Sequence, residues 1–331
     1  MIAAIGAFDG FHLGHQALLD RAIEKANEVG SSWGVITFSN HPDRYFGKRA
    51  SGEGNDSEMG SGFKSIFVLR EQRLLERFFE IPNVRRINFT REIAEMAPEE
   101  FLDYIGNGFG ASGLVVGEDF RFGKDRSGNP KSLTESCARR GWSADVVPMR
   151  LAADGRPICS TLVREAVISG EMRRAWELLG YPFFSKNRVV HGFNRGTSLG
   201  FPTANIEIHP HKIGIRHGVY ATLASVGGVW LTGAANVGLN PTFNDIDSPR
   251  FEVNLLGYEG DLYGSEIAVF MLDHIRDEIQ FSNTDDLAAQ VTRDAETIKK
   301  LSAKALSEHK DLWDKFSLAL SPVFDGTGKL V

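Results

Sequence analysis

Residues 5–15 read Ile-Gly-Ala-Phe-Asp-Gly-Phe-His-Leu-Gly-His, and this stretch indicates how the first half of the chain folds. The apolar run at residues 2–7 predicts a buried strand. Gly6, Gly10 and Gly14 allow the backbone to turn sharply and to approach a ligand closely. The following residues predict a helix, whose apolar face consists of Leu18, Leu19, Ala22, Ile23, Ala26 and Val29.

His12 and His15 lie where this predicted helix begins. The N-terminus of a helix favours anions, because its free N–H groups and its dipole point at the ligand. Imidazole groups beside such a site can donate hydrogen bonds to charge that develops on a phosphate. The pattern therefore predicts a phosphate site. The alternative is a surface loop with two incidental histidines.

The composition indicates a globular protein with more than one domain. The chain has 331 residues, of which 42% are hydrophobic, and two domains are more consistent with this length than one. The net charge of −6 argues against a nucleic-acid partner. Two cysteines without metal-like spacing fit a reducing compartment. A strand that begins at Ile2 leaves no room for a signal peptide, and no apolar run is long enough to span a membrane. We therefore expect a cytoplasmic location and no membrane partner.

Strand and helix patterns alternate through the first half. Apolar runs at residues 33–38, 84–88, 113–117 and 143–147 predict strands, and residues 69–80 and 98–105 predict helices between them. Such alternation favours an α/β fold with a doubly wound parallel sheet, in which ligands bind at the carboxyl ends of the strands. Residues 47–62 are rich in Gly, Ser, Asp and Glu and predict a mobile loop.

The long form of the first motif, Phe-Asp-Gly-x-His-x-Gly-His, resembles the FMN adenylyltransferase module of bacterial FAD synthetases, a nucleotidyltransferase with a Rossmann-like fold. The resemblance implies that His12 and His15 are catalytic and stabilise the transition state at the α-phosphate of ATP. It also implies that Gly6, Phe8 and Gly14 belong to the ATP site. The loop at residues 47–62 is unlike the proline-containing segment of that family, which puts the local flavin-site lid in doubt.

Two further motifs in this half are similar to those of the same family. Residues 117–123, Gly-Glu-Asp-Phe-Arg-Phe-Gly, resemble its Gly-x-Asp/Asn-Phe-x-Phe-Gly motif, which implies that Asp119, Phe120 and Phe122 bind flavin. The alternative is that both phenylalanines anchor the loop in the core. Residues 158–164 resemble its second phosphate signature, with Ser160, Thr161 and Arg164 at the leaving pyrophosphate. The alternative there is an ordinary helix cap with a solvent-facing arginine.

The pattern changes near residues 181–184, where we place the boundary between a first domain, residues 1–182, and a second, residues 183–305. Short β-type runs separated by glycine turns follow, and they predict a closed antiparallel β-barrel. Val226-Gly227-Gly228-Val229 reads as a hairpin. Residues 284–304 predict a C-terminal helix, and residues 306–331 form an extension without an assigned role.

Residues 196–205, Gly-Thr-Ser-Leu-Gly-Phe-Pro-Thr-Ala-Asn, contain glycines and small polar residues that can wrap phosphates. Thr203 and Asn205 are hard oxygen donors that face one way on an extended segment, a set that suits Mg²⁺. The decapeptide resembles the riboflavin kinase signature, which implies phosphate binding by Gly196 and Gly200. It also implies Mg²⁺ and phosphate binding by Thr203 and Asn205. The alternative is a polar turn between two strands.

Glu252 alternates with apolar neighbours on a predicted strand, so it points either into the barrel mouth or into solvent. The surrounding residues resemble the catalytic strand of riboflavin kinases, which implies that Glu252 is the general base toward the riboflavin 5′-hydroxyl. Residues 274–276 resemble the flavin-holding segment of the same kinases, which implies a flavin contact for Arg276.

The resemblance spans about residues 2 to 305 and both sets of motifs. It implies a bifunctional riboflavin kinase and FMN adenylyltransferase, with riboflavin, FMN and ATP as substrates and Mg²⁺ as cofactor. Two alternatives stay open: only one module is active, or the protein is a flavin-binding regulator with silent sites. The second alternative is disfavoured, because flavin binding alone does not require the catalytic residues that this chain retains: His12, His15, Thr203, Asn205 and Glu252.

Overall fold

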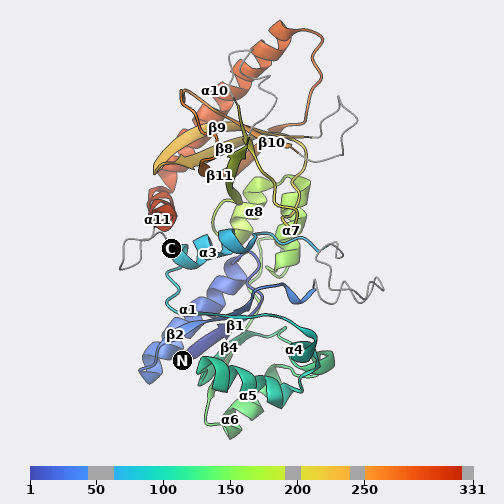
Figure 1. The fold of residues 1–331 in the computed structure, drawn as a ribbon, viewed down its shortest axis with the longest axis vertical. Coiled ribbons are helices and arrows are strands. Elements are labelled where there is room, and N and C mark those ends of the chain that lie inside the picture. Colours follow the sequence, from blue (N-terminus) through green and yellow to red (C-terminus); the bar gives the residue numbers. More distant parts are fainter. Residues whose placement is uncertain (44–62, 191–202, 239–249, 323–331) are drawn as a thin grey trace. The chain divides into compact units, whose positions relative to one another are not determined.

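The structure is a computed structural model that describes residues 1–43, 63–190, 203–238 and 250–322. Its contacts divide the chain into two compact units (Figure 1). Unit 1 comprises Met1–Leu69 and Phe79–Leu162, and unit 2 comprises Arg70–Phe78 and Val163–Val331. Unit 2 therefore includes a segment from the middle of the first half of the sequence. The boundary at residues 182/183 and the role of residues 306–331 stay predictions.

Unit 1 is built on a parallel sheet with the strand order β3-β2-β1-β4-β5. Its elements are β1 (Ile2–Ile5), α1 (Leu13–Val29), β2 (Trp33–Phe38), β3 (Val84–Ile87), α4 (Arg91–Glu95), α5 (Pro98–Phe109), β4 (Gly113–Gly117), η1 (Lys124–Arg126), α6 (Pro130–Arg139) and β5 (Ser143–Val147). The expected doubly wound α/β fold is confirmed.

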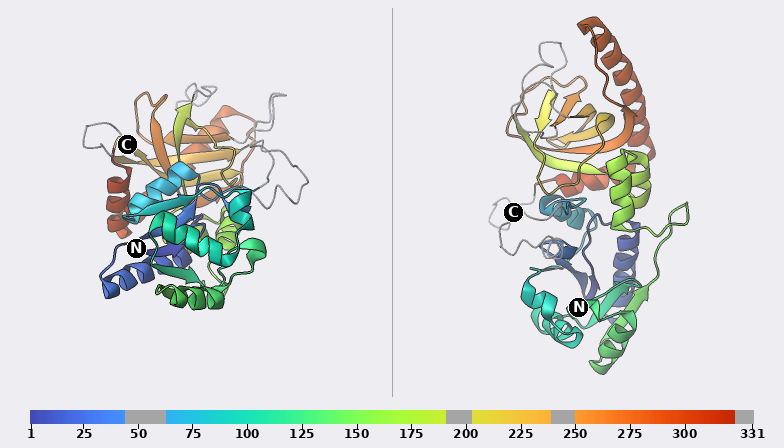
Figure 2. Two further views of the ribbon diagram at one scale, coloured as in Figure 1. Left: turned by 60° about the horizontal axis from the view of Figure 1, so that its bottom comes forward. Right: turned by 90° about the vertical axis from the view of Figure 1, so that its right-hand side faces the viewer.

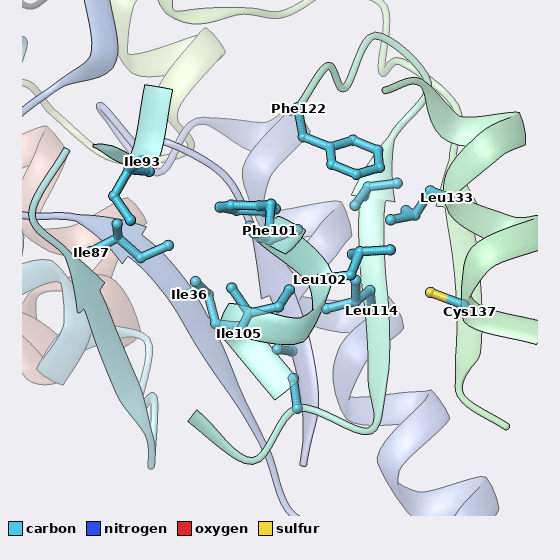
Figure 3. Close-up of a cluster of buried hydrophobic side chains, with 14 residues drawn as sticks. Ile36, Ile87, Ile93, Phe101, Leu102, Ile105, Leu114, Phe122, Leu133 and Cys137 are labelled. Carbon is cyan, nitrogen blue, oxygen red and sulfur yellow. The ribbon is translucent and has the colours of Figure 1, made fainter. Parts of the chain in front are cut away.

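The two faces of this sheet bury different helices, because neighbouring residues on a strand point in opposite directions. Leu18, Leu19, Ala22 and Ala26 of α1 are buried, and α1 contacts β1, β2 and β4. The other face supports a cluster of apolar side chains from the strands and from α4, α5 and α6 (Figure 3). Val29 was expected on the buried face of α1, but it is 53% exposed, because the helix ends directly after it at Gly30.

Unit 2 contains a closed barrel (Figure 2). Its strand order is β10-β7-β6-β11-β8-β9. Its elements are α3 (Leu69–Phe78, all but its first residue), α7 (Ser160–Ser169, from Val163 on), α8 (Met172–Leu179), β6 (Phe184–Val190), β7 (Thr203–Ile206), β8 (Gly218–Val226), β9 (Val229–Gly238), β10 (Arg250–Leu255), β11 (Glu266–Arg276), α10 (Thr284–Glu308) and α11 (Lys310–Leu320). The barrel pairs antiparallel throughout, as expected.

The hairpin expected at residues 226–229 is confirmed. Val226 pairs with Val229, and Gly227 and Gly228 take the positive φ values, 56° and 85°, that a two-residue hairpin turn requires. Helix α10 lies against β8, β9 and β11 and covers that side of the barrel. The helix expected at residues 284–304 thus exists and runs on to Glu308.

An aromatic cluster fills the space between the barrel and the helices of unit 2. Phe316 of α11 is fully buried and stacks on Phe78 of α3 at 4.1 Å between ring centroids. The Phe270 ring of β11 lies 4.7 Å from the Phe316 ring. Trp313 is also buried, and its indole N–H donates to the carbonyl of Ala305. The segment expected to be an extension thus supplies core side chains.

Candidate active sites

The loop between β1 and α1, residues 6–12, has an unusual backbone. Phe8 and Phe11 have φ values of 48° and 38°, and Gly10 lies between them at 101°. Glycine adopts this region freely, but a bulky side chain does so only under strain, at about 1–3 kcal/mol for each residue. Strain of this kind persists only where the surroundings hold the chain in place, and it is concentrated at functional sites.

The two histidines are stacked on each other at the start of α1. His12 is the N-cap, and its Nδ1 accepts a hydrogen bond from the backbone N–H of His15 at 3.3 Å. The two rings are 3.7 Å apart between centroids and 18° from parallel. A Cβ on Gly14 would lie 2.9 Å from the carbonyl oxygen of Ile158, so this position needs glycine for close approach. At Gly6 a Cβ would make only ordinary contact with the Phe8 ring.

His15 is neutral at pH 7 in this environment. Burial lowers its pKa well below the usual 6.5, and the neighbouring His12 and His41 lower it further. Its Nδ1 is buried and, within the part of the chain that the structure describes, has no hydrogen-bond partner. A buried polar atom without a partner is rare and calls for a functional explanation. His15 therefore has a ring nitrogen available for a ligand.

The second phosphate motif reaches the same loop through Ser160. The hydroxyl of Ser160 donates to the backbone carbonyl of Asp9 at 2.8 Å, which brings the first residue of α7 beside residues 6–12. Thr161 is exposed next to it, and Arg164 lies one helical turn further along α7. The structure thus brings Ser160 to the histidine loop, while Arg164 belongs to the part of α7 in unit 2.

The aromatic residues after β4 are partly structural. Phe122 is 6% exposed, belongs to the apolar cluster beneath the sheet and lies 6.0 Å from the Phe101 ring (Figure 3). Phe120 is half-buried and stacks on Phe122 at 5.6 Å. The Phe122 ring is thus anchored in the core, and its contact with flavin stays a prediction. Asp119 is exposed at the carboxyl end of β4.

The barrel presents a polar face formed by three adjacent strands. Phe251, Val253 and Leu255 of β10 are buried, and the residues that alternate with them are half-buried. In the register of the sheet, Glu252 lies opposite Asn205 of β7 and opposite Asn236 of β9. Residues opposite each other on adjacent strands share a face. Glu252 therefore points away from the apolar interior of the barrel.

Thr203 belongs to the same face, because it lies opposite Asn254 of β10. The structure thus brings Thr203, Asn205 and Glu252 together, as the sequence motifs imply. Two further residues of β10, Arg250 and Asn254, lie on this face, and Nη1 of Arg250 is 3.7 Å from Oε1 of Glu252. The alternation of polar and apolar residues along 250–255 could have shown that Arg250 and Asn254 share a face with Glu252. Gly196 and Gly200 lie outside the described residues.

Arg276 is held at the end of β11 by a carboxylate of α10. Its Nε and Nη2 each lie 2.9 Å from Oδ2 of Asp294. Asp294 is buried and also accepts a hydrogen bond from Gln290 at 2.8 Å. No sequence pattern indicates this pair, because its members are 18 positions apart and on different elements. Arg276 can meet a ligand only with the parts of its guanidinium that Asp294 leaves uncovered.

Both sets of motifs match known families. Residues 1–162 match the family model described as FAD synthetase, and residues 179–302 match the one described as riboflavin kinase. A bifunctional riboflavin kinase/FMN adenylyltransferase of Haemophilus influenzae is 34% identical over 298 residues, or 89% of this chain and 92% of the relative. The protein of that name from Listeria monocytogenes is 31% identical over 303 residues, 92% and 93% of the two chains.

The chain belongs to the bifunctional riboflavin kinase/FMN adenylyltransferase family. The resemblance drawn from the motifs is confirmed, and with it the activity: the enzyme makes FMN from riboflavin and FAD from FMN, with ATP in both steps. A solved chain from Streptococcus pneumoniae, described as a macrolide-efflux protein, is similar with a TM-score of 0.79 and 29% identity, over 90% of this chain and 93% of that one. Across the described residues, no helix of this riboflavin kinase/FMN adenylyltransferase is long and apolar enough to cross a membrane.

Proposed function

We propose that the two reactions use two separate sets of residues. Adenylyl transfer would occur at the loop of residues 6–15 with Ser160, and riboflavin phosphorylation at the polar face of β7, β9 and β10. The observation that carries this division is the register of β10. It pairs Glu252 with Asn205, and the next pair on the same face is Asn254 with Thr203.

In the kinase reaction, Glu252 would take the proton from the riboflavin 5′-hydroxyl as that oxygen attacks the γ-phosphate. Thr203 and Asn205 would hold Mg²⁺. Their hydroxyl and amide oxygens are hard donors, both are half-buried, and both lie on the face that carries Glu252. When bound, Mg²⁺ neutralises charge on the phosphates. Arg250 would orient the Glu252 carboxylate, and Asn254 would orient the Thr203 side chain.

In the adenylyl-transfer reaction, a phosphate oxygen of FMN attacks the α-phosphorus of ATP and pyrophosphate leaves. His12 and His15 would donate hydrogen bonds to the charge that develops at the α-phosphate. A neutral His15 suits this role, because it can donate without a charge that burial disfavours. Ser160, Thr161 and Arg164 would stabilise the leaving pyrophosphate. Asp119, Phe120, Phe122 and Arg276 stay candidates for contact with flavin, and the cytoplasmic location stays a prediction.

The test is a pair of variants assayed in both reactions. Glu252→Gln should abolish FMN formation from riboflavin and leave FAD formation from supplied FMN intact. His15→Ala should do the reverse, with a loss of adenylyl transfer of about 100- to 1,000-fold, the usual effect of removing one preorganised donor. Glu259→Gln, at an exposed position of the same barrel, is the matched control. Equal losses in both reactions for either variant would contradict the division.

A further inference from the structure

The strained loop of residues 6–12 is held in place by a buried carboxylate. Asp9 lies between Phe8 and Phe11 and is fully buried. Its Oδ1 and Oδ2 accept a hydrogen bond from the backbone N–H of Ile66 at 3.0 and 3.2 Å, and its Oδ1 lies 3.4 Å from the N–H of Phe67. A buried carboxylate is tolerated only where such donors satisfy it. The side chain of Asp9 thus ties the loop to the segment that precedes α3.

The backbone and the neighbours of Asp9 are fixed as well. Its carbonyl accepts from Ser160 at 2.8 Å, so the residue joins three segments that are far apart in the sequence. Gln16 donates to the carbonyl of Phe11 at 2.8 Å, and the Phe11 ring stacks on Phe79 at 5.6 Å. These contacts explain how positive φ values persist at two phenylalanines, because they hold the chain directly after Phe8 and at Phe11.

The loop is in direct contact with the histidine pair. The Phe8 ring lies 5.2 Å from the Phe11 ring and 5.0 Å from the ring of His15. His12 follows Phe11 directly and caps α1. If the loop relaxed to an ordinary backbone, the Phe8 ring and the His12 cap would both move, and the stacked pair would lose its alignment. Small misplacements of catalytic groups lower reaction rates strongly.

We propose that Asp9 is a positioning residue for adenylyl transfer: its carboxylate holds the strained loop in the conformation that presents His12 and His15 to the α-phosphate. Asp9 acts through the loop, since its carboxylate is turned toward the N–H groups of Ile66 and Phe67. The proposal rests on the role of the histidines proposed above. It assigns a role to Asp9, which belongs to the first motif but had none in the sequence analysis.

The test is Asp9→Asn in the full chain, with steady-state kinetics of both reactions. Asparagine keeps the size and one acceptor oxygen and removes the charge. We expect kcat for FAD formation from FMN to fall about ten- to a hundredfold, the effect of losing a charge-assisted hydrogen bond. KM for FMN and ATP should change less than about threefold, and riboflavin phosphorylation by the same molecules should be unchanged. Asp20→Asn, at an exposed position of α1, should change neither reaction.

A purely structural role gives a different pattern. It would lower both reactions in proportion to the folded fraction, or raise KM at constant kcat, and either result would overturn the proposal. If Asp9→Asn does not fold, Gln16→Ala decides instead, because it removes the donor to the Phe11 carbonyl and should lower kcat for adenylyl transfer a few-fold. Should His15→Ala leave FAD formation intact, the proposed histidine role fails. Should only Asp9→Asn and Gln16→Ala leave it intact, the positioning role alone fails.

Discussion

Lys212→Met tests whether α3 is an integral part of unit 2. The ammonium of Lys212 lies 2.6 Å from Oε2 of Glu71, and the two side chains are 4% and 1% exposed. Lys212 also donates to the carbonyl of Phe184 at 2.9 Å, while Oε1 of Glu71 accepts from the N–H of Lys186 at 2.9 Å. Methionine matches the length of lysine without its charge, so the substitution leaves the Glu71 carboxylate buried beside an apolar group.

The expected loss follows from that burial. Removing one partner of a buried ion pair typically costs about 3–5 kcal/mol. Glu71 keeps its bond to the N–H of Lys186, so we expect a value near the lower end, about 3 kcal/mol. Adding Glu71→Gln should restore part of the loss, because it removes the uncompensated charge. The double variant should therefore lose less unfolding free energy than the two single variants together, by at least about 1 kcal/mol.

The assay is urea unfolding of the full chain, followed by tryptophan fluorescence. Trp230 and Trp313 lie in the aromatic cluster of unit 2, so the emission includes the transition of that unit beside the contribution of Trp33 and Trp142 in unit 1. Lys304→Met is the matched control, because Lys304 is 67% exposed and lies 3.9 Å from its partner Glu308. It should change stability by less than about 1 kcal/mol. An equally small change for Lys212→Met would refute the reasoning.

Two further outcomes concern the core of unit 2 and the histidine site. Phe316→Ala should lower the unfolding free energy of unit 2 by about 3–5 kcal/mol, since the ring is fully buried, whereas Leu318→Ala, at a position 71% exposed, should have little effect in the same urea titration. Because the pKa of His15 is lower in the folded state than its unfolded value near 6.5, the unfolded state takes up the proton first. The unfolding free energy should therefore be independent of this group above about pH 6.5 and fall below it, and His15→Ala should reduce that fall.

The sequence predicted most of the architecture of unit 1, because strands buried on both faces are near-continuous apolar runs. Residues 33–38 and 113–117 are such strands with the expected bounds. Residues 143–147 also have the expected bounds, although this strand lies at the edge of the sheet and is only partly buried. The hairpin at residues 226–229 was equally readable, since two consecutive glycines between apolar runs permit few other structures. The apolar runs and the two glycines are local patterns, so they can be recognised without knowledge of distant residues.

The features that escaped prediction depend on distant residues. The helical pattern of residues 69–80 gave α3, but it could not show that Glu71 would be buried against a lysine 141 positions away. Motif resemblance named Phe122 as a flavin contact, but it could not show that the ring would join an apolar cluster drawn from α5, α6 and the sheet. The positive φ of Phe8 and Phe11 had no signal either, because contacts from Ser160, Gln16 and Phe79 stabilise it.

Helix α3 makes this enzyme hard to divide. Its residues 70–78 are part of unit 2, and the residues on both sides of it are part of unit 1. A single cut between the two catalytic regions would leave the barrel fragment without Glu71 and Phe78, and the other fragment with an amphipathic helix whose buried face has lost its partners. Two independently expressed enzymes could be obtained from this chain only by grafting residues 70–78 onto the barrel fragment or by replacing the residues that bury them. Inserting a flexible spacer near residue 182 would not separate the two units, because the chain also passes from unit 1 into unit 2 and back at α3.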